Sequence, residues 1–109
     1  METRINIVIP SIQLSDELIF CLTKLNNQDY KNFFVTIVLD FKNKRKLPKV
    51  NYKLNTLISG AKNMSYKRNL GVKKYKSNIV SFLDSDAYPP KNWLKIANNF
   101  LIKKKNKKI

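Results

Sequence analysis

The chain of 109 residues contains no histidine and a single cysteine, Cys21. Without imidazole it can form neither a histidine-based zinc site nor a catalytic triad of the Ser-His-Asp type. One thiol excludes an internal disulfide, and the place of Cys21 in an apolar helical pattern indicates a buried structural side chain. No apolar run reaches the ~18 residues that a membrane-spanning helix needs, and residues 1–10 lack the charged and apolar regions of a secretory signal. We therefore expect a cytoplasmic protein.

Arginine is scarce as well, although the chain is strongly basic. The formal net charge is +15, but arginine occurs only at positions 4, 45 and 68. Arginine is the better side chain for bidentate recognition of phosphates and base edges, so nucleic acid is not an expected partner. Asparagine and isoleucine are also abundant, and we attribute most of the lysine excess to an A/T-rich genome. Peripheral contact with the cytoplasmic face of a membrane stays open, because clustered lysines gain about 1 kcal/mol each near anionic lipids.

The hydropathy pattern predicts an α/β fold in a single domain. The expected elements are a strand over residues 4–10, a helix that starts at 15–16, a strand over 33–39, a short strand over 56–59, a helix over 63–75, a strand over 79–83 and a helix whose first turn includes Pro90. Residues 41–53 are rich in lysine and indicate an exposed loop. Alternation of strands and helices favours a mostly parallel sheet with helices on both faces and right-handed crossovers.

Two carboxylates follow the last expected strand. Four of residues 79–83 are apolar, as in a strand covered on both faces, and Asp84 and Asp86 come directly after it with Ser85 between them. Paired carboxylates of this kind can hold a magnesium- or manganese-like ion against phosphate oxygens and water. The alternative interpretation is a polar turn that caps the next helix.

Polar residues at the other strand ends predict a nucleotide site. Ser11 follows the first strand and Asp40 the second, and ligands of such sheets bind at the carboxyl ends of the strands. Arg68 shares one face of the 63–75 helix with apolar neighbours, so we expect it to point inward and to meet an anion; outward extension or pairing with a core carboxylate is the alternative. No glycine-rich motif follows the first strand, which argues against dinucleotide oxidoreductases and P-loop ATPases.

The runs INIVIPSI, VTIVLD and SYKRNLGVKKYKSNIVSFLDSDAYPPKNWL, in this order, resemble the nucleotide-binding half of the inverting family 2 glycosyltransferases, which have a GT-A fold. The resemblance covers about residues 4–101. Its most specific part is KRNxG at residues 67–71, FLDSD at 82–86, and then Pro90 and the pair at 93–94. By this resemblance Asp40 contacts the uracil or other base, Arg68 the base or the diphosphate, and Asp84 the ribose. Asp86 would bind the divalent cation, Mn²⁺ or Mg²⁺, that bridges the diphosphate.

The same resemblance implies the substrates. Pro10 and Ser11 would line the nucleotide pocket, and the expected donor is a nucleotide-diphospho-sugar, most simply a UDP-sugar. The acceptor would be a glycan or a lipid-linked acceptor, and the transfer an inverting one of the hexosyl type. Family members often carry a second acid and a small-residue turn after the second strand, whereas Phe-Lys-Asn-Lys follows Asp40 here.

Family members also continue into an acceptor half that usually supplies the catalytic base, and no residue of this chain is a convincing base. We therefore expect a nucleotide-sugar-binding GT-A half-domain over residues 1–102 and a basic tail over 103–109. The chain would be a fragment of a longer enzyme, a product of a split or frameshifted gene, or a donor-binding remnant. In isolation it is expected to expose apolar surface and to be inactive in transfer.

A different functional class also fits the composition: a non-enzymatic basic module that binds nucleic acid or anionic membrane through its lysines. Such a module needs no acids at strand ends. Asp40, Asp84 and Asp86 would repel phosphate in the absence of a metal, which favours the glycosyltransferase interpretation.

Overall fold

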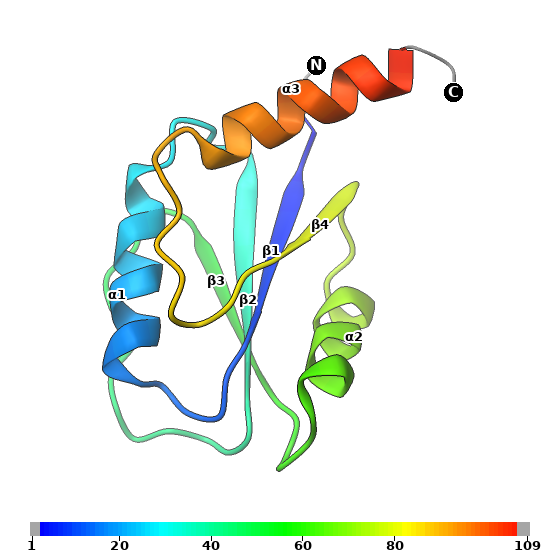
Figure 1. Cartoon of the computed structure of the whole chain (residues 1–109). Helices are drawn as coiled ribbons and strands as arrows, with labels where there is room; N and C mark the ends of the chain where they lie inside the picture. The colour runs from blue at the N-terminus through cyan, green and yellow to red at the C-terminus, as the bar shows by residue number, and fades with distance from the viewer. Residues whose placement is uncertain (1–2, 107–109) are drawn as a thin grey trace.

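The computed structural model describes the backbone of residues 3–106 and the side chains of residues 3–100 (Figure 1). Within these residues, four parallel strands form one sheet in the order β3-β2-β1-β4. The strands are β1 (Ile5–Pro10), β2 (Phe33–Leu39), β3 (Lys53–Ile58) and β4 (Ile79–Phe82). The helices are α1 (Asp16–Lys24), η1 (Leu25–Asn27), α2 (Met64–Lys74) and α3 (Trp93–Asn106). This arrangement confirms the predicted α/β class with a parallel sheet.

Helices cover both faces of the sheet, because successive strand residues point to opposite sides. Ile5, Ile7 and Ile9 of β1 join one buried apolar cluster with α1 residues and with Leu94 of α3. Val8, between them in β1, instead meets Gly71 of α2. Helix α1 and the start of α3 therefore lie on one face, and α2 lies on the other.

The two central strands are buried along their whole length, whereas β4 is not. Among the described residues, strand β4 pairs with β1 alone, so it forms one edge of the sheet, and Phe82 at its end is 49% exposed. The expectation that this strand would be covered on both faces is therefore wrong. Its apolar sequence resembles that of a central strand, but an edge strand leaves one side open.

Helix α2 docks through close backbone approach and polar contacts. A Cβ atom at Gly71 would lie 2.6 Å from Val8 Cγ1, so the helix backbone sits directly on β1. The buried Asn6 amide donates to the carbonyls of Tyr75 (2.9 Å) and Gly71 (3.4 Å) at the end of α2. The Thr36 hydroxyl in turn donates to the Asn6 side chain (2.9 Å). These contacts position the helix whose sequence has only a weak apolar stripe.

Helix boundaries agree with the sequence signals at some ends and not at others. Ser15 caps α1 by accepting a hydrogen bond from the Leu18 amide (3.1 Å), as predicted. Helix α3 begins at Trp93, beyond Pro90, and continues to residue 106. The helix thus passes the expected boundary at residue 102, since lysine is a good helix former. Residues 107–109 of the expected tail lie outside the described residues.

Strand β3 starts at Lys53 instead of Thr56. Its first residues pair with β2 through the backbone, with Lys53 opposite Phe34, although they form no apolar run. Strand β3 is the other edge of the sheet, where polar side chains can face water. Across residues 3–106, no helix combines the length and apolar character required to cross a bilayer.

Candidate functional site

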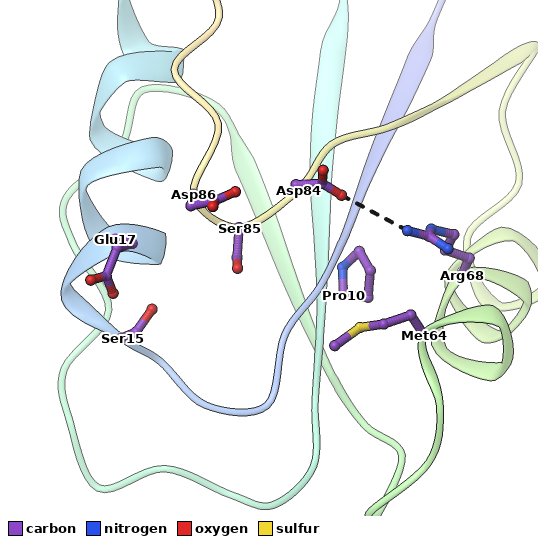
Figure 2. Close-up of a pocket in the computed structure, with 8 residues that line it drawn as sticks. All are labelled: Pro10, Ser15, Glu17, Met64, Arg68, Asp84, Ser85 and Asp86. Atoms are coloured by element: carbon purple, nitrogen blue, oxygen red, sulfur yellow. Dashed lines mark ion pairs between the residues drawn. The ribbon is translucent and has the colours of Figure 1, made fainter.

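A pocket of about 510 Å³ lies at the carboxyl ends of β1 and β4 (Figure 2). From β1 the chain runs to β2 and β3 on one side and returns to β4 on the other. Such a reversal of strand order leaves a crevice in which ligands of parallel sheets bind. The lining residues come from the end of β1, the start of α1, helix α2 and the turn after β4: Pro10, Ser15, Glu17, Met64, Arg68, Asp84, Ser85 and Asp86.

Arg68 and Asp84 face each other across one side of this pocket. Arg68 Nη2 lies 3.8 Å from Asp84 Oδ1, and the two side chains are 36% and 77% exposed. At this distance the two groups form an ion pair but no hydrogen bond, and at such exposure solvent strongly screens their attraction. Both groups therefore keep most of their hydrogen-bonding capacity for a ligand.

The inward-pointing side chain of α2 is Lys67, and the expectation that Arg68 would point inward is wrong. Lys67 is fully buried, and it shares the sheet-facing side of the helix with Gly71, one turn later. Each residue turns the helix by about 100°, so Arg68 points instead toward the pocket. In a lysine-rich sequence no single lysine stands out, and the four-residue spacing from Gly71 was the signal that could have identified Lys67.

Lys67 binds Asp40, the acid that was expected to contact the base. Its ammonium forms a hydrogen-bonded ion pair with Asp40, whose side chain is 14% exposed. It also donates to the carbonyl of Ser11 (2.7 Å). Asp40 lines a separate pocket of about 410 Å³, together with Ile12, Gln13 and residues 41–44.

Of the predicted site residues, the structure thus brings together Pro10, Arg68, Asp84 and Asp86. Ser11 is buried beside them, and its hydroxyl donates to the Gln13 carbonyl (2.9 Å). The sequence interpretation did not assign three other pocket residues to the site. These are Ser15 and Glu17 at the start of α1 and Met64 at the start of α2. Glu17 carried no motif signal, since an acid in the first turn of a helix is common for dipole reasons alone.

The oxygen donors of this pocket suit a hard divalent cation. In Figure 2 Asp86 lies on the α1 side of the pocket, and Asp84 lies on the α2 side next to Arg68. Within residues 3–106, no group of three or more His, Cys, Asp or Glu side chains is placed to hold a metal ion. One or two carboxylates completed by phosphate oxygens and water fit the way Mg²⁺ is usually held with nucleotides. The residues therefore fit an ion that arrives together with a nucleotide.

Asp86 also acts on the helix behind the pocket. Burial and, secondarily, the negative charge of Asp86 raise the pKa of the Cys21 thiol to about 11. The thiol is fully buried and stays protonated near neutral pH, as the sequence pattern indicated. Cys21 thus belongs to the core and offers no nucleophile to the pocket.

Comparison with known proteins identifies the family to which this chain belongs. Residues 6–106 match the sequence model of glycosyl transferase family 2. The chain belongs to glycosyltransferase family 2. The resemblance found in the DSD and KRNxG motifs is therefore confirmed. A search of curated protein sequences returns no match.

Solved structures of S. aureus TarS are similar to this family 2 chain. The structure of TarS residues 1–349 has a TM-score of 0.75 and 26% sequence identity, over 92% of this chain and 32% of that one. The same fragment in complex with UDP-GlcNAc gives a TM-score of 0.75, with 26% identity over 92% of this chain and 31% of that one. Its complex with UDP gives a TM-score of 0.74, with 27% identity over 92% of this chain and 32% of that one. The chain thus spans about a third of the TarS fragment that it matches.

Proposed function

We propose that this chain is the donor-binding part of an inverting, hexosyl-type family 2 glycosyltransferase and that it binds a UDP-sugar together with Mn²⁺ or Mg²⁺. The observation that carries the proposal is the convergence of Asp84, Asp86 and Arg68 on one pocket where the strand order reverses. The TarS fragment, which binds UDP-GlcNAc and UDP, supports it through a similar fold.

The charges of the pocket explain why a cation is required. Glu17, Asp84 and Asp86 are three acids against the single guanidinium of Arg68 among the lining residues. A diphosphate entering this pocket alone would meet net repulsion. A divalent cation on Asp86 would neutralise charge on the diphosphate leaving group.

We propose the remaining roles from the family resemblance, and the positions of the residues support them. Arg68 would contact the diphosphate or base from the α2 side, and Asp84, beside it, the ribose. Pro10 would line the pocket at the end of β1. Asp40 and the neighbouring Ser11 are assigned to the base, since Asp40 retains an exposed part beyond its contact with Lys67. This assignment places the base toward β2 and the diphosphate toward β4.

The acceptor, a glycan or a lipid-linked acceptor, would bind outside the part described here. Inverting transfer needs a general base that deprotonates the attacking hydroxyl. Because the chain spans about a third of the TarS fragment, we propose that further sequence supplies this base. The 109-residue chain should then bind the donor without transferring sugar.

Calorimetric titration of UDP tests the proposal, with Mn²⁺ and with EDTA, at moderate and at high salt. We expect binding that requires Mn²⁺ and persists at high salt, whereas nonspecific attraction of phosphate to lysines weakens steeply with salt. Equal affinity in Mn²⁺ and EDTA would reject the metal role, and binding that disappears at high salt would favour a basic module instead.

Asp86→Asn locates the metal. This variant should lose the Mn²⁺ dependence while it keeps its fold, because the Asp86 side chain lies in an exposed turn. Asp29→Asn is a matched control, since Asp29 is an exposed acid that precedes β2, at the amino ends of the strands and away from the pocket. Full Mn²⁺ dependence in Asp86→Asn would place the ion elsewhere.

A further inference from the structure

Lys67 is a buried charge that the proposed function does not place in contact with the donor. Its side chain has no solvent exposure, although lysine is among the residues least often buried and this chain has ample exposed positions for it. Burial of an ammonium group is costly unless partners compensate it. The partners of Lys67 therefore have to compensate the cost of burying its charge.

The contacts of Lys67 join three elements at the carboxyl edge of the sheet. From α2 its ammonium reaches the Ser11 carbonyl after β1 (2.7 Å) and the Asp40 carboxylate after β2. The Ser11 amide is itself bonded to the Val38 carbonyl of β2 (3.0 Å). Lys67 thus fixes α2 to a strand end that cannot shift freely.

This attachment lies at the part of α2 that faces the pocket. The Asn6 hydrogen bonds and the close approach of Gly71 hold the second half of the helix. Lys67 holds the first half, and it directly precedes Arg68. Because neighbouring residues differ by about 100° around a helix, an inward Lys67 determines that Arg68 points toward Asp84.

We propose that Lys67 is a positioning residue for Arg68: its buried ion pair with Asp40 and its bond to Ser11 set the rotation of α2 that presents Arg68 to the diphosphate. The inference rests on the proposed function, because it concerns the same pocket. Lys67 does not line that pocket, so it would act on the diphosphate through Arg68, while its contact with Asp40 lies on the side proposed for the base.

The test is a double-mutant cycle on UDP affinity in the presence of Mn²⁺, measured by calorimetry on Lys67→Met, Arg68→Ala and the combination. Lys67→Met keeps the length of the side chain and removes its charge. We expect it to weaken UDP binding about tenfold, by analogy with the loss of a residue that supports a metal ligand. In the Arg68→Ala background its effect should be much smaller, because the group that it positions is gone and only the contact with Asp40 remains.

Lys73→Met is the matched control, since Lys73 is an exposed lysine of the same helix. It reports the loss of one positive charge without the loss of a buried contact, and its UDP affinity should stay near that of the natural chain. Circular dichroism and thermal melts confirm folding of each variant. Lys67→Gln, which keeps a donor for the Ser11 carbonyl, is measured alongside, and intermediate affinity is expected.

Four results would overturn the inference. If Lys67→Met bound UDP as tightly as the natural chain, the contact would not matter for the pocket, while the proposed function would stand. Multiplicative losses in the double variant would show that Lys67 does not act through Arg68. Failure of both Lys67 variants to fold would make the contact one that the whole fold requires. Absence of UDP binding in the natural chain would reject the proposed function itself.

Discussion

Replacement of Gly71 by alanine tests how α2 is docked, because two opposing effects can be compared. Alanine in a helix is favoured over glycine by about 1 kcal/mol. The added Cβ, however, would lie 2.6 Å from Val8 Cγ1 and 3.2 Å from Cγ2, well inside the ~3.5–4.0 Å that carbon atoms prefer. Val8 is fully buried in a central strand and is stiff at its branched Cβ. Relief therefore requires movement of the helix.

That movement is opposed at the same place, since the Asn6 amide holds the carbonyls of Gly71 and Tyr75. Overpacking of a tight core costs about 1–3 kcal/mol, and we expect the upper part of this range here. After the helix-forming gain is subtracted, Gly71→Ala should lower the free energy of unfolding by about 1–2 kcal/mol. Urea unfolding followed by circular dichroism measures it.

Val8→Ala provides the decisive comparison, because it removes both atoms that would clash. Alone it should cost about 2 kcal/mol for two lost methyl groups and the cavity. Combined with Gly71→Ala it should cost less than the sum, with a coupling of about 1–3 kcal/mol. Additive effects, or a Gly71→Ala variant that gains the full helix-forming free energy, would refute the reasoning from close packing.

Further predictions concern the core. Cys21 should resist alkylation in the folded chain at neutral pH and react only after unfolding, because burial, the main cause, raises its pKa to about 11. Rapid labelling of the native chain would contradict this. Since that folded pKa lies above the ordinary value of 9.0, the unfolded chain loses the thiol proton first. Stability should therefore fall as pH rises from about 9 to about 11, by on the order of 2 kcal/mol, and Cys21→Ala should remove this part of the pH dependence. Superimposable stability curves for the two chains would count against it. The Gln28 side chain, fully buried, donates to the Pro90 carbonyl (2.7 Å) and accepts from the Leu94 amide (3.1 Å). Gln28→Leu should lower the free energy of unfolding by about 2–4 kcal/mol in urea because both backbone groups lose a partner, whereas the same change at the exposed Gln13 should have little effect; equal losses would show that those two bonds are unimportant.

The sequence by itself determined the elements whose signals are local. Apolar runs long enough for buried strands gave β1 and β2 with the observed ends, apart from one residue at the start of β1. Ser15 gave the start of α1, because a cap depends only on residues within one turn. The position of Asp84 and Asp86 at a strand end followed from the residues just before them. The family motif is the basis of the proposed roles, which local patterns cannot give.

Only the tertiary structure decided which side chains meet. The sheet-facing side of α2 depends on where Gly71 contacts Val8, and that contact joins residues far apart in the chain. For this reason Lys67 and not Arg68 is buried, and Asp40 is held by Lys67. The place of β4 at an edge depended likewise on the strand order. Periodicity and run length describe each segment alone, whereas burial and charge pairing are set by its neighbours in space.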